Sequence, residues 1–199
     1  MGSVAFSGCL VSTSSSQLLV GETADVGGME VTLTKFREFG KGELSDVDAD
    51  GEKTTISQKV ILVKFEFRIP TKNKNDMPQN QLPRNFEWEI NTGVSGTAGG
   101  GPLTGARNPD KKYIHKDEDF PSYLYRANKN NFRITDGDKE NGAGARTLEG
   151  WIPFPKPKPS NYSGLDKVKT SDIRIVIRKG DYSPIDKDLK WRLEKASGS

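Results

Sequence analysis

The chain of 199 residues contains one cysteine, Cys9, and one histidine, His115. A single cysteine cannot form a disulfide within the chain, and one histidine with one distant cysteine is too few ligands for a zinc site. Long apolar runs are also missing, since none approaches the roughly 18 residues of a membrane-spanning helix. The 30 basic and 27 acidic residues leave a net charge of +3. That bias is too small to indicate nucleic-acid binding.

Apolar and polar side chains alternate along much of the chain, whereas helical periodicity is nearly absent. The alternation predicts strands in the segments 29–33, 60–69, 86–90, 148–154, 173–177 and 189–193, with shorter candidates at 113–115, 123–126 and 132–135. Turns are supplied by 21 glycines, 11 prolines and clusters of Asn and Asp. Because helical crossovers are missing, we predict an all-β, antiparallel sandwich or barrel with long polar loops.

The predicted strand 60–69 changes character along its length. Every second residue from Ile61 to Ile69 is apolar, which gives one continuous apolar face. On the other face Val60 and Leu62 are followed by charged side chains. The strand is therefore expected to begin buried on both faces and then to emerge into solvent on one of them.

Several turn and strand residues form patterns that are comparable with a known family: Val20-Gly21-Glu22-Thr23, 27–33, 59–69 and 147–155. The first two segments resemble the opening of the DUF4352, telokin-like family, and the third resembles its long central strand. The fourth resembles its late G-x-x-x-F-x-x-P strand, although Pro155 falls one residue early. The resemblance implies an immunoglobulin-like β-sandwich that is secreted or lipid-anchored. It supplies no active-site residues, and the region 92–140 has no counterpart in it.

The N-terminal sequence Phe6-Ser7-Gly8-Cys9 places an apolar residue and two small residues before a cysteine. This pattern resembles the lipobox at which membrane lipoproteins are acylated, and the Ser-rich segment 12–16 would then be a flexible tether. Only five residues precede the pattern, too few for a complete signal peptide. The alternative is a free cysteine on a short N-terminal strand.

An acidic stretch at residues 46–52 is the sharpest local motif. Asp46, Asp48, Asp50 and Glu52 alternate with other residues, and oxygen ligands at such spacing can surround Ca²⁺. An EF-hand would need a glutamate at position 57, which is Ser57. The alternative is a solvated acidic hairpin loop.

Asn161-Tyr162-Ser163 is an N-glycosylation sequon in a polar, proline-flanked loop. Such a loop would be accessible at the surface. The sequon is therefore mild support for an extracellular location.

No catalytic constellation emerges from the sequence. His115 lies beside acidic residues, but no nucleophile elbow accompanies it. Glu87 and Glu89 share one strand face and would suit a carboxylate pair of a hydrolase, yet they suit the solvated side of a strand equally well. We expect a protein that is not an enzyme and that requires no cofactor, with Ca²⁺ as the one candidate metal.

Basic side chains gather on the outer faces of the last two predicted strands. They are Arg174, Arg178, Lys179, Lys190 and Arg192. If the two strands pair, like charges would meet across the ladder, which costs free energy unless acids or an anionic ligand intervene. Stacking aromatics are missing from that face, which argues against nucleic acid.

Together these observations favour a non-catalytic cell-surface protein, with residues 1–16 as a membrane tether and 17–199 as one β-sandwich domain. Cys9 would carry the lipid, and the partner would be a cell-envelope or extracellular protein or a glycan. An alternative is the subunit of an extracellular filament or pilus, because alternation from Val4 to Gly8 would suit a donor strand. A secreted hydrolase that uses Glu87 and Glu89 is a third hypothesis.

Overall fold

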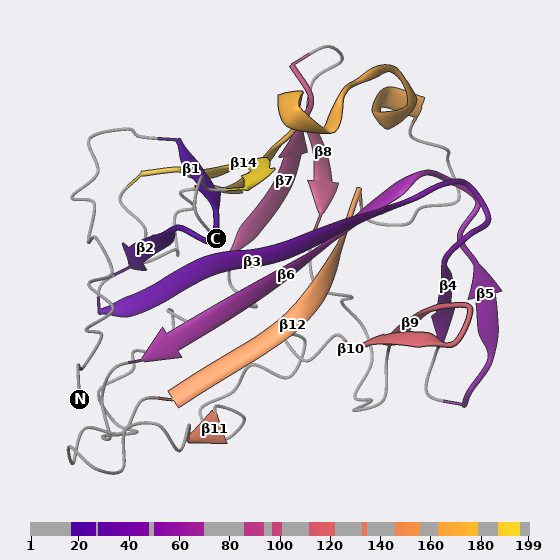
Figure 1. The fold of residues 1–199 in the computed structure, drawn as a ribbon, viewed down its shortest axis with the longest axis horizontal. Coiled ribbons are helices and arrows are strands. Elements are labelled where there is room, and N and C mark those ends of the chain that lie inside the picture. Colours follow the sequence, from indigo (N-terminus) through magenta and orange to yellow (C-terminus); the bar gives the residue numbers. More distant parts are fainter. Residues whose placement is uncertain are drawn as a thin grey trace, which may run out of the picture.

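The computed structural model describes residues 17–26, 28–47, 50–69, 86–93, 97–100, 112–121, 133–134, 146–155, 163–178 and 187–195. Within these ranges the chain consists of strands and two short 3-10 turns (Figure 1). The elements are β1 (Leu18–Val20), β2 (Thr23–Val26), β3 (Met29–Phe39), β4 (Ser45–Val47), β5 (Lys53–Thr55), β6 (Val60–Ile69), β7 (Glu87–Asn91), β8 (Thr97–Gly100), β9 (Lys112–His115), β10 (Glu118–Pro121), β11 (Arg133–Ile134), β12 (Arg146–Phe154), η6 (Ser163–Lys167), η7 (Thr170–Asp172), β13 (Arg174–Arg178) and β14 (Leu189–Lys195). No helix in the described ranges is long and apolar enough to cross a membrane.

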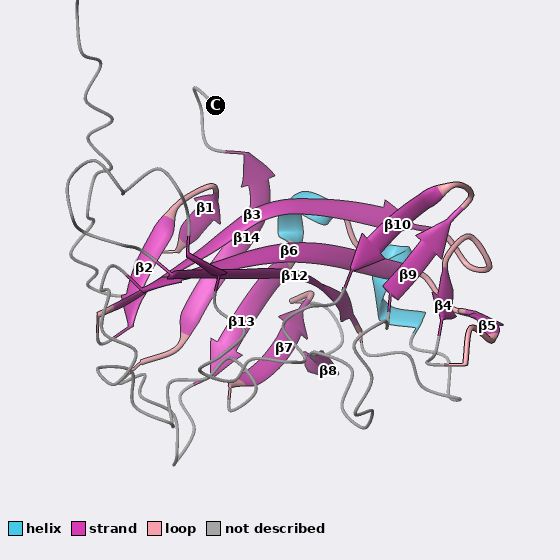
Figure 2. Ribbon diagram, turned by 90° about the horizontal axis from the view of Figure 1, so that it is seen from below, coloured by secondary structure: helices cyan, strands magenta, loops and turns pink. Residues whose placement is uncertain are grey.

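The strands form two five-stranded sheets and one four-stranded sheet. One large sheet has the order β1-β14-β13-β7-β8 and the other β11-β12-β6-β3-β2, while the small sheet has the order β10-β9-β4-β5. In Figure 2 the long strands β3, β6 and β12 run across the strands of the other large sheet. Neighbours are antiparallel except β1, which pairs parallel with β14. The all-β sandwich predicted from the sequence is confirmed.

The main core lies between the two large sheets. The odd positions of β6 all face it, and Phe65 packs edge-on against Trp88 and Trp191, with ring centroids 4.9 and 5.3 Å apart. Aromatic rings bury large apolar areas, and edge-to-face pairs add about 0.5–1.5 kcal/mol each. The alternation seen in the sequence therefore marks the inner faces of both sheets.

A second, smaller core explains why β6 begins with four apolar residues in a row. Val60 and Leu62 point away from the main core and are fully buried beneath the small sheet, together with Tyr113 of β9 and Phe120 of β10. Lys64, further along the same face, is only half-buried. The prediction that strand 60–69 begins buried on both faces and then emerges into solvent on one of them is therefore confirmed. Part of the region 92–140 is responsible, because it supplies β9 and β10.

The N-terminal strands close one corner of the sandwich. The chain passes from β1 in one large sheet to β2 in the other through Gly21, whose φ of 95° is unfavourable for a residue with a side chain. The Nε1 of Trp191 donates a hydrogen bond of 3.2 Å to the carbonyl oxygen of Glu22. This corner therefore fixes β1 against the C-terminal strand β14.

Candidate functional site

Outward-facing residues of β1, β14, β13 and β7 form a row across one of the large sheets. In this row Leu19 lies opposite Arg192, Arg192 opposite Arg174, and Arg174 opposite Asn91. Directly opposed residues on neighbouring strands share a face of the sheet. The like-charge encounter foreseen from the sequence therefore occurs, between Arg174 and Arg192.

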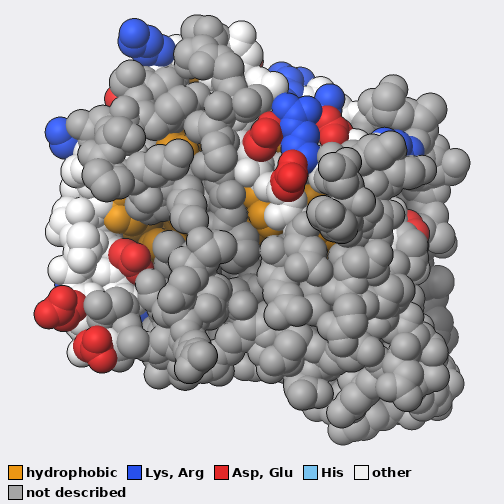
Figure 3. Space-filling model, turned by 180° about the vertical axis from the view of Figure 1, so that it is seen from behind, with side chains coloured by type: hydrophobic (Ala, Val, Ile, Leu, Met, Phe, Trp, Pro, Cys, Tyr) orange, Lys and Arg blue, Asp and Glu red, His pale blue; other side chains and the backbone are white. Residues whose placement is uncertain are grey.

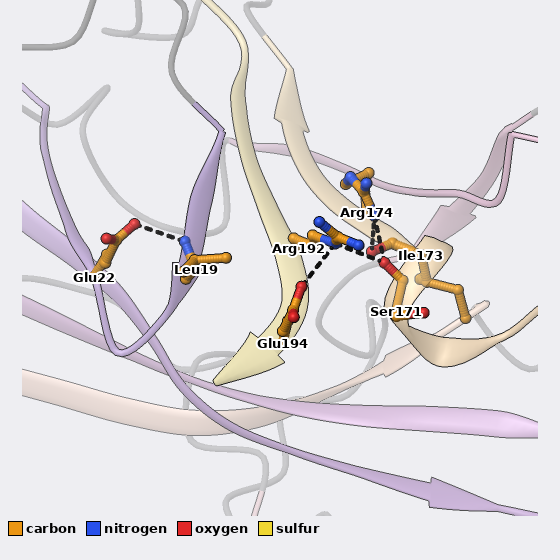
Figure 4. A network of polar contacts seen from close by, with 7 residues as sticks. All are labelled: Leu19, Glu22, Ser171, Ile173, Arg174, Arg192 and Glu194. Carbon is orange, nitrogen blue, oxygen red and sulfur yellow. Dashed lines mark hydrogen bonds and ion pairs between the residues drawn. The ribbon is translucent and has the colours of Figure 1, made fainter. Parts of the chain in front are cut away.

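A backbone carbonyl lies between the two guanidinium groups. The Ser171 carbonyl oxygen accepts hydrogen bonds from Nη1 of Arg174 at 2.8 Å and from Nε of Arg192 at 2.9 Å (Figure 4). Nη1 of Arg174 also donates to the carbonyl oxygen of Ile173 at 3.1 Å. The 3-10 turn η7 thus contacts both arginines through the carbonyl oxygen of Ser171, an acceptor suited to cationic donors.

The remaining donors of the two arginines differ. With the Gln17 amide oriented so that its oxygen accepts, that oxygen faces Nε and Nη2 of Arg174. Nε of Arg192 also contacts the Glu194 carboxylate at 3.0 Å. Within the described part of the chain, Nη1 and Nη2 of Arg192 have no hydrogen-bond partner. Among the described residues, four N–H groups of Arg192 are thus without an acceptor.

Burial is the main cause that lowers the pKa of Arg174, and the charge of Arg192 adds to it. Asp172 and Glu194 act in the opposite direction, but they do not offset these two effects. The electrostatic environment of Arg174 is therefore unfavourable for a cation and would be improved by an anion.

Further along β13, Arg178 has a different environment. Its Nε donates to Glu89 and its Nη1 to Asp188, both at 2.7 Å. These two hydrogen bonds raise the pKa of Arg178. Figure 3, seen from behind, shows basic side chains in direct contact with acidic ones among the described residues.

The glutamates considered for a hydrolase take part in this same arrangement. Glu89 is paired with Arg178, and Glu87 lies opposite Arg178 in the strand register. Glu87 is exposed, whereas the side chain of Glu89 is 26% exposed. Glu89 therefore has a structural role as a charge partner of β13.

The predicted calcium ligands are divided between a strand and a turn. Asp46 belongs to β4 and lies opposite the buried Tyr113, whereas Asp50 and Glu52 lie in the exposed segment before β5. Asp48 lies outside the described residues. Among the residues that are described, no group of three His, Cys, Asp or Glu could hold a metal ion. A calcium site at Asp46, Asp48, Asp50 and Glu52 stays a prediction, to be tested by the melting temperature with and without CaCl₂.

Two titratable side chains of the small sheet, Tyr113 and His115, lie close to other groups of that sheet. Burial, and secondarily the charge of Asp46, raises the pKa of the Tyr113 phenol well above its ordinary value. The ring of His115 packs against Phe39 with centroids 5.1 Å apart. His115 thus contributes to packing at this sheet. Cys9 and Asn161 lie outside the described residues.

Comparisons with known proteins do not assign this chain to a family. No protein-family model matches the chain, and no curated protein is significantly similar to it. Among solved structures, the yjhA protein from Bacillus subtilis superposes with a TM-score of 0.40 and 11% identity, over 89% of this chain and all of that one. The resemblance to the DUF4352, telokin-like family therefore stays a prediction.

The central acceptor of the arginine row could not be found from sequence. The pattern of basic residues singled out Arg174 and Arg192, but the group that holds them is the carbonyl oxygen of Ser171. A backbone carbonyl is common to every residue, so its role depends on the three-dimensional path of η7.

Proposed function

We propose that this protein is a non-catalytic β-sandwich displayed at a cell surface and held to the membrane by lipid on Cys9. The observation that carries the proposal is the order of elements at the N-terminus. The lipobox-like Cys9 and the Ser-rich segment 12–16 directly precede Gln17, where the described domain begins with the edge strand β1. A chain that joins the domain at a sheet edge can act as a tether without interrupting the sandwich.

The proposed role is to bind or scaffold a partner outside the cytoplasm, either a cell-envelope or extracellular protein or a glycan. Long connections between rigid strands are where binding residues of β-sandwich proteins are usually found. The sequon at Asn161 lies in one such connection, between β12 and η6. It supports an extracellular location if the protein comes from an organism that glycosylates asparagine.

The test is the chemical state of Cys9 in protein isolated from its native cells. We expect mass spectrometry to find a mature N-terminal peptide that begins at a diacylglycerol-modified Cys9. Cys9→Ser should move the protein from the membrane fraction to the soluble fraction. Ser12→Ala, a change of similar size three residues away, is the matched control and should leave the protein in the membrane fraction.

A peptide that extends upstream of an unmodified Cys9 would overturn the anchor. The filament hypothesis would then lead, because β1 is a short strand at the end of its sheet. Such an edge accepts an added strand from a neighbouring copy. Purified protein that remains monomeric at high concentration would reject that alternative as well.

A further inference from the structure

We infer that Arg174 and Arg192 form a binding site for a phosphate group, carried either by a soluble phosphate compound or by a lipid headgroup. The two guanidinium groups are held side by side by one acceptor, the Ser171 carbonyl oxygen. Nη1 and Nη2 of Arg192 have no hydrogen-bond partner in the described ranges. A planar guanidinium binds phosphate through two parallel N–H groups, which is the arrangement that these two nitrogens offer.

The strand register shows which residues lie directly beside Arg192. Arg192 is flanked across the sheet by Leu19 on one side and Arg174 on the other, so no carboxylate lies directly opposite it. Glu194, on the same strand, forms an ion pair with Arg192, and Asp172 of η7 acts electrostatically on Arg174. Glu194 is 51% exposed and contacts Nε of Arg192. It would therefore compete with a phosphate group without blocking it.

The position of the arginine pair suggests how it could be used. Gln17 contacts Arg174 and Leu19 lies opposite Arg192, so the pair lies where residues 1–16 join the domain. Gln17 follows Cys9 by eight residues, which span at most about 28 Å when fully extended. If Cys9 is lipidated, a step that rests on the proposed function, the pair lies within reach of headgroup phosphates.

The first experiment uses the full chain with Cys9→Ser, so that its outcome does not depend on acylation. Inorganic phosphate is titrated at constant ionic strength while backbone amide NMR shifts are followed. We expect saturable shifts at Leu19, Asp172 and Arg192. Arg192→Gln should weaken binding at least fivefold, whereas Glu194→Gln should strengthen it because a competing carboxylate is removed.

Lys190→Gln is the matched control. Lys190 lies on the same strand and the same face as Arg192, is exposed, and carries the same charge. Its loss should change phosphate affinity less than twofold. Equal weakening by Lys190→Gln and Arg192→Gln would show only a diffuse charge effect and would overturn the site, as would shifts that do not saturate. If Arg192→Gln fails to fold, the increase expected for Glu194→Gln decides the matter.

A second arm distinguishes the two sources of phosphate. The same Cys9→Ser protein is sedimented with vesicles of phosphatidylcholine alone or mixed with phosphatidylglycerol. Binding to the mixed vesicles that is lost in Arg192→Gln but kept in Lys190→Gln assigns the site to lipid headgroups. Saturable phosphate shifts without vesicle binding assign it to a soluble phosphate compound. Absence of both effects would overturn the inference, whatever the state of Cys9.

Discussion

Arg174 and Arg178 lie four residues apart on β13 and on the same face of the same sheet, yet their surroundings are opposite. Arg178 is held between the carboxylates of Glu89 and Asp188, which raise its pKa. Arg174 faces Arg192, and its pKa is lowered by burial and by that second charge. Identical side chains on one strand therefore have pKa values that are shifted in opposite directions.

The comparison separates a structural charge from one that is available for binding. The charge of Arg178 is already matched within the described part of the protein, so the loss of its guanidinium would leave two carboxylates without this partner. Arg174 and Arg192 instead share the neutral Ser171 carbonyl oxygen as an acceptor, and Nη1 and Nη2 of Arg192 have no hydrogen-bond partner in the described ranges. A protein that keeps two cations opposed across a ladder gives up stability unless an anion joins them.

The largest expected effect comes from breaking the matched cluster. Arg178→Ala removes both ion pairs from Glu89 and Asp188, whose side chains are only 26% and 25% exposed. Hydrogen bonds to charged groups are worth more than neutral ones, although partial exposure reduces the effect. We expect the free energy of unfolding to fall by about 1–2 kcal/mol, as measured by urea denaturation. A change as small as that of Lys190→Ala would contradict the structural role of Arg178.

A smaller effect should follow from a charge reversal at Arg192, which places opposite charges across the ladder from Arg174. Arg192→Glu places a carboxylate opposite Arg174, and cross-strand pairs of opposite charge contribute about 0.2–1 kcal/mol. The substitution also removes the hydrogen bond to Ser171 and the ion pair with Glu194, which oppose this gain. We therefore expect the free energy of unfolding, measured by urea denaturation, to change by less than about 1 kcal/mol while phosphate binding is lost. A strong loss of stability would instead show that Arg192 is needed to hold η7.

The change Arg174→Gln should have less effect on stability than either of these. It removes the like-charge contact with Arg192, but it also removes the hydrogen bonds to the carbonyl groups of Ser171 and Ile173. Because the two effects oppose each other, we expect a change within about 0.5 kcal/mol in thermal or urea unfolding. A loss comparable with that of Arg178→Ala would remove the distinction between the two arginines.

Salt should produce the smallest and most diagnostic difference. Raising NaCl from about 0.05 to 0.5 M screens exposed charges. The stability difference between wild type and Arg178→Ala should shrink by a few tenths of a kcal/mol, because an attraction is screened. The difference between wild type and Arg174→Gln should move in favour of the wild type, since a repulsion is screened. Changes of the same sign for both variants would contradict the comparison.

The long strands could be predicted because each has a full apolar face. In β6, β12, β13 and β14 the apolar residues that face the main core recur at every second position over five or more residues. The short strands β1, β4, β5 and β10 have only three or four residues each. Period-two alternation over so few residues is too weak a signal to distinguish them from loops.

The candidate site was predictable only as a concentration of charge. Arg174, Arg178 and Arg192 are assigned to outer strand faces by the apolar residues between them, which needs no structure. The partner of each arginine depends on which strand lies beside β13. Glu89 reaches Arg178 from β7, and Asp188 reaches it from the segment before β14; neither contact can be predicted from the spacing of these residues in the sequence.

The sequence by itself determined that this protein is built from strands, which residues of its long strands face inward, and that basic side chains lie on the outer face of the last two strands. These properties follow from the local period of the chain and the burial of apolar surface. Only the tertiary structure decided that Arg178 meets carboxylates while Arg174 meets Arg192 across a shared carbonyl oxygen. Charge interactions depend on distances between strands, and those distances are set by register and topology rather than by local sequence.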